Sequence, residues 1–248
     1  MSDLLTLQGV HTHIGAYHIL HGVDLAVPAG QVTMLLGRNG AGKTTTLRTI
    51  MGLWPTSKGA VRFDGQQIGG QGGQRATPDI AQLGIAYVPE NMGIFSDLTV
   101  RENLLLAARG ARTVEQMDTA RLEWLFGLFP ALKKFWLYPA GKLSGGQKQM
   151  LSVARAMVEE RRLLLIDEPS KGLAPAIVQN LIESLRELKR TQTTVLLVEQ
   201  NFAMAKALGD RVAVMDDGRV VHAGAMKELA EDDALQHKFL GLSLGAHQ

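Results

Sequence analysis

The stretch that decides the fold reads Gly37-Arg38-Asn39-Gly40-Ala41-Gly42-Lys43-Thr44 and matches the pattern G-x-x-x-x-G-K-[ST]. It lies between a short apolar run at residues 32–36 and apolar positions with helical spacing from Leu47 onward. Glycines let successive backbone N–H groups turn toward phosphate oxygens, and the start of a helix adds positive potential. In this pattern Lys43 reaches the β- and γ-phosphates of a nucleotide, and Thr44 can bind Mg²⁺. The stretch therefore predicts a strand, a phosphate-binding loop and a helix, with a chance glycine-rich turn as the alternative.

Two adjacent carboxylates follow a second short apolar run. Residues 163–166 are all apolar, and Asp167 and Glu168 come directly after them. Such a run predicts a buried strand, and ligands of parallel sheets bind at the carboxyl ends of the strands. One carboxylate can hold Mg²⁺ through water, and the other can polarise an attacking water. Alone, the pair is typical of a solvated strand end, but beside a phosphate-binding loop it predicts a site of nucleotide hydrolysis.

Strand and helix patterns alternate along most of the chain. Strand patterns recur at residues 5–10, 23–27, 32–36, 61–68, 84–88, 163–166, 194–198, 212–215 and 220–222. The first two predict antiparallel strands, whereas later ones separated by helical patterns predict a parallel sheet. Asp217 and Gly218 predict a hairpin near the end. The glycine-rich residues 69–73 predict a flexible loop.

The order of these patterns predicts one α/β domain with three parts. They are a core with an antiparallel β-subdomain, an inserted helical subdomain and a C-terminal helical cap. Their expected bounds are residues 1–90 with 160–225, residues 91–159, and residues 226–248. The insertion is inferred from a helical pattern between about Thr99 and Glu160, with breaks at Pro130 and Pro139.

Composition disfavours several classes of function. The 26 Lys and Arg residues nearly balance the 24 Asp and Glu residues, so a formal charge of +2 gives no argument for nucleic-acid binding. The absence of cysteine excludes disulfides and thiolate metal sites, which fits a reducing compartment. No apolar run approaches the ~18 residues that span a bilayer, and Met1-Ser2-Asp3 lacks a basic leader. We therefore expect a folded protein that does not itself cross a membrane.

A third motif, Leu143-Ser144-Gly145-Gly146-Gln147, gives the sequence a family resemblance. Ser144 can cap the helix that follows, and the glycines expose backbone donors to an anion, although a plain capped helix is the alternative. Together with the phosphate-binding loop and Asp167-Glu168, the motif resembles the signature of ABC ATPases. The resemblance covers essentially the whole chain. It implies a P-loop NTPase (RecA-like) core with an N-terminal antiparallel β-subdomain and an inserted α-helical signature subdomain.

The resemblance also implies a shared site. In ABC ATPases two nucleotide-binding domains stack head to tail, and each ATP lies between the phosphate-binding loop of one chain and the signature of the other. The residues implied to contact the nucleotide are Gly37, Arg38, Asn39, Gly40, Ala41, Gly42, Lys43, Thr44, Thr45, Ser144, Gly145, Gly146 and Gln147. Those implied to hold Mg²⁺ are Thr44, Asp167 and Glu90. Those implied in catalysis are Glu168 as the base, Gln200 and Glu90.

Two positions depart from the commonest pattern of the family. Glu90 stands where most members have glutamine, and Gln200 stands where most have histidine. Glu90 keeps an oxygen ligand but adds negative charge, whereas Gln200 can hydrogen-bond a γ-phosphate but cannot be protonated. An ordinary helix start is the alternative for Gln200. With residues 88–90, 168–175 and 197–201, the departures resemble the ATPases of importers for branched-chain, or more broadly hydrophobic, amino acids.

A third departure concerns the adenine of ATP. Many relatives place an aromatic residue before a glycine where this chain has Ile14-Gly15. Stacking on the base must then come from His13 or Tyr17, or be replaced by apolar contact. Plain surface positions are the alternative for both side chains.

Apolar residues also follow Glu90, at the predicted junction of the sheet and the helical subdomain. They are Gly93, Ile94, Phe95 and Leu98. In ABC transporters this junction meets a short coupling helix of the permease. Exposed apolar side chains there would form a binding groove, and buried ones would be core.

The resemblance implies a transport motor at the cytoplasmic face of the inner (plasma) membrane of a bacterium. The implied partners are a second ABC ATPase subunit, two permease subunits and, indirectly, a secreted solute-binding protein, with no nucleic acid. The ATPase pair is a heterodimer in the transporter or a homodimer alone. Importers of urea, short amides or aromatic acids are alternatives. A soluble ABC ATPase or a protein with a dead ATP site is disfavoured, because the single motif set is intact and no long coiled-coil insertion is present.

Overall fold

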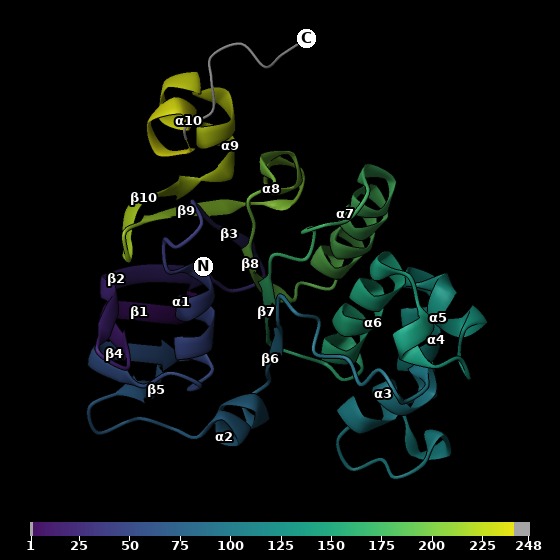
Figure 1. Cartoon of the computed structure of the whole chain (residues 1–248). Coiled ribbons are helices and arrows are strands. Elements are labelled where there is room, and N and C mark those ends of the chain that lie inside the picture. Colours follow the sequence, from purple (N-terminus) through teal and green to yellow (C-terminus); the bar gives the residue numbers. More distant parts are fainter. Residues whose placement is uncertain (1, 241–248) are drawn as a thin grey trace.

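A six-stranded sheet runs through the centre of the molecule in the order β10-β9-β3-β8-β7-β6 (Figure 1). The computed structural model describes residues 2–240, so residues 241–248 of the expected helical cap lie outside the described residues. The strands are β3 (Val32–Gly37), β6 (Ile85–Val88), β7 (Leu163–Asp167), β8 (Thr194–Val198), β9 (Arg211–Asp216) and β10 (Arg219–Ala225). Neighbouring strands are parallel except β9 and β10. The parallel sheet and the hairpin at Asp217-Gly218 are confirmed.

The central strands are buried on both faces. In β3, Leu35 packs into one hydrophobic core, whereas Met34 and Leu36 pack into another. Strands β7 and β8 alternate in the same way. The core that contains Met34 and Leu36 lies between the sheet and the helices on one of its faces. The core that contains Leu35 lies between the sheet and the antiparallel strands. Burial on both faces explains why these strands read as continuous apolar runs in the sequence.

A second, antiparallel sheet lies beside the first and has the order β2-β1-β4-β5 (Figure 1). Its strands are β1 (Asp3–Ile14), β2 (Tyr17–Pro28), β4 (Thr56–Phe63) and β5 (Gln66–Gly70). The pair β1 and β2 confirms the antiparallel strands predicted near the N-terminus. The single strand predicted at residues 61–68 is wrong. A turn with positive φ at Asp64 and Gly65 divides this stretch into β4 and β5.

The flexible loop predicted at residues 69–73 is also wrong in part. Gly69 and Gly70 are buried and belong to β5, and only residues 71–73 form a turn. A Cβ at Gly70 would lie 2.3 Å from the carbonyl oxygen of Gly59 on the neighbouring strand. Glycine therefore stands here because the two backbones approach closely, which is a packing reason rather than a need for flexibility.

Helices flank the central sheet, and Figure 1 shows α3 to α6 gathered on the opposite side of β6 and β7 from the antiparallel sheet. They are α1 (Lys43–Ile50), α2 (Thr77–Gln82), α3 (Val100–Ala107), α4 (Thr119–Leu128), α5 (Pro130–Lys134), α6 (Gly145–Met157), α7 (Pro175–Arg190), α8 (Phe202–Leu208), α9 (Met226–Glu231) and α10 (Asp233–Leu240). Pro130 starts α5 rather than continuing α4, as the predicted break requires. Among residues 2–240, no helix combines the length and the apolar character that a bilayer crossing needs.

Candidate functional site

The phosphate-binding loop joins β3 to α1 and is closed by its own lysine. Lys43 is buried, and its Nζ donates to the carbonyl oxygens of Gly37 and Arg38 at 2.9 and 3.0 Å. Gly42 has a φ of 100°, and a Cβ there would lie 2.9 Å from Cδ2 of Leu20, so this turn requires glycine. The loop thus presents a cation at the first turn of a helix, where backbone N–H groups also favour an anion.

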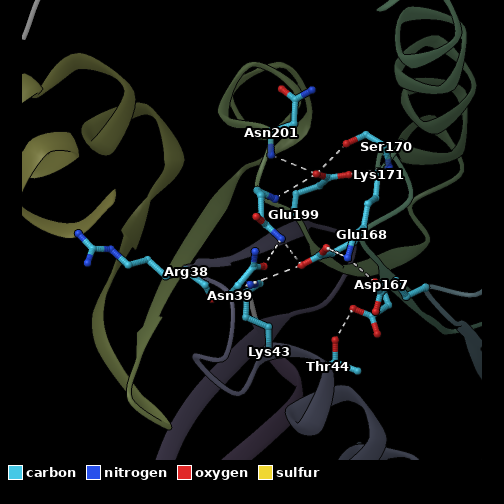
Figure 2. Close-up of polar contacts among 12 residues, drawn as sticks. Arg38, Asn39, Lys43, Thr44, Asp167, Glu168, Ser170, Lys171, Glu199 and Asn201 are labelled. Atoms are coloured by element: carbon cyan, nitrogen blue, oxygen red, sulfur yellow. Dashed lines mark hydrogen bonds and ion pairs between the residues drawn. The ribbon is translucent and has the colours of Figure 1, made fainter. Parts of the chain in front are cut away.

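Asp167 ends β7 as a buried carboxylate with two hydrogen-bond donors. Thr44 Oγ1 donates to Oδ1 at 3.0 Å, and the Tyr87 hydroxyl donates to Oδ2 at 3.1 Å (Figure 2 shows the Thr44 contact). Burial raises the pKa of the Asp167 carboxyl, while the two hydrogen bonds oppose that rise. Burial and the nearby charge of Asp167 raise the pKa of Tyr87 to about 12, so the phenol stays a donor at neutral pH.

Glu168 occupies a tight turn at the end of the same strand. Its φ of 46° is left-handed, which is uncommon for a residue with a Cβ, and its N–H donates to the carbonyl oxygen of Val198 at 2.9 Å. The carboxylate lies 3.5 Å from Lys43 Nζ and accepts a hydrogen bond from Gln200 Nε2 at 2.7 Å. Gln200 Nε2 also lies 2.6 Å from Asn39 Oδ1. Four residues predicted for the site, from three segments, therefore form one cluster: Asn39, Lys43, Glu168 and Gln200. Figure 2 labels the first three of them.

Glu90 joins the same cluster through a lysine. Lys171 Nζ lies 2.5 Å from Glu90 Oε1 and 3.6 Å from Glu168 Oε2. The hydrogen bond with Glu90 raises the pKa of Lys171, so the ammonium group is charged at neutral pH. Within residues 2–240, no hydrogen bond joins Glu90 directly to Thr44 or Asp167. Lys171 thus links Glu90 to Glu168, the second of the two carboxylates at the end of β7.

Three residues form hydrogen bonds or ion pairs with predicted site residues but were not themselves predicted for the site: Tyr87, Lys171 and Glu199. Glu199 is buried at the end of β8 and accepts hydrogen bonds from the backbone N–H groups of Ser170, Gln200 and Asn201 and from the Ser170 hydroxyl. It fastens the segment after β7 to the segment after β8 (Figure 2). The sequence did carry a signal for it, because a carboxylate directly follows an apolar strand, as at Asp167.

The signature residues lie apart from this cluster within the chain. Ser144 caps α6: its Oγ accepts from the Gln147 N–H at 3.3 Å, and its own N–H donates to Gln147 Oε1 at 2.9 Å. Gly146 packs against Ile177 at the start of α7. In the described part of the chain, no hydrogen bond or ion pair joins residues 144–147 to residues 37–45. One chain therefore presents two separate groups of predicted nucleotide contacts.

The candidates for adenine contact lie at the turn between β1 and β2. Tyr17 is exposed. His13 stacks on His18 with 4.2 Å between ring centroids and hydrogen-bonds Ser57 Oγ at 3.1 Å. Ile14 is partly exposed. Their contact with adenine stays a prediction.

A model of the family described as ABC transporter matches residues 20–171. The chain belongs to the ABC transporter family. The matched residues include the phosphate-binding loop, the signature and both carboxylates after β7, so the family match covers most of the site. The chain is an ATP-binding ABC transporter ATPase, as its sequence motifs implied.

Several relatives of the ABC ATPase match it over nearly their full length. The high-affinity branched-chain amino acid transport ATP-binding protein BraG of Pseudomonas aeruginosa is 37% identical over 238 residues, which cover 96% of this chain and 100% of the relative. The probable branched-chain amino acid transport ATP-binding protein LivF of Archaeoglobus fulgidus is 35% identical over 226 residues, or 91% of this chain and 93% of the relative. A solved ATP-binding subunit of an ABC transporter is similar with a TM-score of 0.80 and 29% identity, covering 96% of both chains. The predicted fold class is confirmed.

Proposed function

We propose that this ABC ATPase energises the import of branched-chain or other hydrophobic amino acids. The observation that carries the ATPase part is the cluster of Lys43, Glu168 and Gln200, which places a buried cation and an amide donor on one carboxylate. Support for the cargo comes from the two relatives named for branched-chain amino-acid transport, each matched over most of its length.

In this proposal residues 37–45 bind the phosphates of ATP, and Glu168 orients and deprotonates the attacking water. Gln200 holds the Glu168 carboxylate in place through its amide. Thr44 and Asp167 fit Mg²⁺, because their hydroxyl and carboxylate oxygens lie 3.0 Å apart at a strand end. Glu90 supplies a further oxygen nearby. Mg²⁺, when bound, offsets the charge of the β- and γ-phosphates.

The proposed partners follow from the division of the contacts into two groups. Within residues 2–240, no hydrogen bond or ion pair joins residues 144–147 to the phosphate-binding loop, so in this proposal they serve the ATP of a second ABC ATPase subunit. We propose a heterodimer in the transporter and a homodimer of the isolated chain. In this proposal, two permease subunits and a secreted solute-binding protein complete the importer. The ATPase then lies at the cytoplasmic face of the membrane.

Exposed apolar side chains support docking of a permease on the helical side. Phe95 is 50% exposed, and Leu137 and Tyr138 in a second segment are also exposed. Backbone hydrogen bonds such as Ala140 N–H to the Leu98 carbonyl hold the two segments side by side. Exposed apolar side chains of this kind fit the apolar face of a short helix.

We expect Phe95→Glu to abolish most cargo uptake by the assembled transporter while leaving basal ATP hydrolysis by the isolated subunit within about twofold of wild type. The substitution puts a charge into the apolar contact, where an unpaired charge is costly. Uptake into vesicles and phosphate release measure the two effects. Leu53→Glu is the matched control, because Leu53 is 48% exposed and lies outside these two segments. If Phe95→Glu instead unfolded the isolated subunit, Phe95 would belong to the core.

We expect Gln200→His to change the rate of ATP hydrolysis and to add an ionisation between about pH 6 and 8. Gln200 does not titrate, so its contact with Glu168 creates no pH dependence of its own. A protonated imidazole would pair with Glu168 and offset the charge of the base, so the new ionisation should lower the rate on its acid side. The pH profile of ATP hydrolysis by the homodimer checks this. An unchanged rate and profile would place Gln200 away from the reaction.

Transport by the assembled importer tests the cargo. Permease and binding-protein subunits, which we expect to be encoded beside this chain, are reconstituted with it in vesicles, and uptake is compared among leucine, urea, a short amide and an aromatic acid. We expect ATP-dependent uptake of leucine that is lost when this chain carries Glu168→Gln. Uptake of urea, the amide or the aromatic acid without leucine would assign a different cargo to the same motor.

A further inference from the structure

Lys171 lies between two carboxylates that come from different segments. Its Nζ is 2.5 Å from Oε1 of Glu90, in the segment after β6, and 3.6 Å from Oε2 of Glu168, in the segment after β7. Lys171 and Glu90 are 81 positions apart in the sequence. Because β6 and β7 are neighbours in the sheet, the lysine joins the two segments that leave their carboxyl ends.

Negative charge gathers at this edge of the sheet. Asp167, Glu168 and Glu90 bring their carboxylates to the ends of β6 and β7, where the phosphates of ATP would add more negative charge. Lys43 is held by the carbonyl oxygens of the phosphate-binding loop and by Glu168. Lys171 is therefore the cation that pairs with Glu90. Without it, the charge of Glu90 would be left unbalanced and would repel incoming phosphates, an effect that salt weakens.

The ion pair of Lys171 and Glu90 is too exposed to be explained by a contribution to folding stability. The Lys171 side chain is 58% exposed and that of Glu90 is 38% exposed. Ion pairs this open to solvent contribute little to folding stability, so their loss should leave the fold intact. The pair also uses only one oxygen of Glu90, since no hydrogen bond within residues 2–240 uses Oε2. The second oxygen can thus still face a ligand while Lys171 fixes the carboxylate.

We propose that Lys171 is a positioning residue of the ATP site, which offsets the charge of Glu90 and fixes that carboxylate beside Glu168. The inference rests on the proposed function, since it concerns the same ATP site. It explains how a glutamate is tolerated at position 90: the lysine supplied by the segment after β7 balances the added charge. Removing the lysine should therefore impair ATP binding only as long as Glu90 is present.

A double-mutant cycle on the purified full chain tests this. A fluorescent ATP analogue is titrated, with and without Mg²⁺, into wild type, Lys171→Met, Glu90→Gln and the double variant. We expect Lys171→Met to weaken binding about five- to tenfold at low salt, and the loss to shrink as salt rises, because it arises from partly exposed charges. In the Glu90→Gln background, Lys171→Met should change affinity by less than about twofold, since no charge is left to offset. Lys171→Arg should stay within about twofold of wild type.

Lys133→Met is the matched control, because Lys133 pairs with Glu123 at 2.9 Å and is similarly exposed, at 60%, on the helical side. It should leave ATP affinity unchanged. The proposal is overturned if Lys171→Met binds ATP like wild type, if its loss is the same with Gln at position 90, or if Lys133→Met weakens binding equally. ATP hydrolysis is measured separately. Wild type that binds the analogue but releases no phosphate from ATP would refute the proposed function. The double-mutant cycle on nucleotide binding would still decide the role of Lys171.

Discussion

Glu168→Gln should lower the turnover of ATP roughly 100- to 10,000-fold, the usual contribution of a positioned general base. In the proposed mechanism, the change removes the charge that polarises the attacking water while keeping nearly the same shape. The Glu168 backbone, with its left-handed φ and its hydrogen bond to Val198, needs no rearrangement. Lys43 remains bonded to the Gly37 and Arg38 carbonyls, so the phosphate-binding loop keeps its form. ATP affinity should therefore be retained.

Phosphate release and nucleotide titration, carried out on the same preparation, check the two halves of this prediction. Glu183→Gln is a suitable control, because Glu183 lies on α7 away from the cluster and its charge should not affect turnover. A Glu168→Gln variant that turned over ATP like wild type would show that another group activates the water.

Lys43→Ala should weaken ATP binding by about 1.5–3 kcal/mol, the range of a hydrogen bond to a charged group. That corresponds to roughly a 10- to 150-fold loss of affinity. The buried ammonium group donates to two loop carbonyls and lies 3.5 Å from Glu168, so its removal also leaves that carboxylate without its nearest cation. Binding and turnover should both fall, in contrast to the Glu168 variant.

The affinity of Lys43→Ala for ATP is measured by titration, with thermal unfolding followed in parallel to show that the fold persists. Lys142→Ala is a matched control, because Lys142 lies in the turn before the signature and not in the phosphate-binding loop. Unchanged ATP affinity in Lys43→Ala would contradict the role of Lys43 as a phosphate ligand.

The parts of the fold that local patterns determine were predictable from the sequence. The loop at residues 37–44 predicted a strand before it and a helix after it, and Asp217-Gly218 predicted the last hairpin. At Asp64-Gly65 the same type of turn signal was present but lay inside an apolar run that reads as one strand. Gly69 and Gly70 misled for another reason: whether a glycine means flexibility or close packing depends on what faces it across the sheet.

Much of the site was predictable because its residues lie at or just after strand ends, which the topology brings to one edge, although Glu199 after β8 was missed. Asp167 and Glu168 meet the phosphate-binding loop for this reason, and Gln200 reaches Glu168 from the next strand. Lys171 could not be found in this way, since its role depends on a partner 81 positions away. The stacking of His13 on His18 likewise arises from strand register, which the sequence did not specify.

Phosphate release from ATP by the purified chain, with Mg²⁺ and after its chelation, tests most directly the claim that Glu168 is the base of an ATPase. We expect steady release by wild type that requires Mg²⁺, and release near background by Glu168→Gln, although both proteins bind ATP equally well. Equal release by wild type and Glu168→Gln, or release that persists unchanged after chelation, would show that Glu168 is not the base of a Mg²⁺-dependent ATPase.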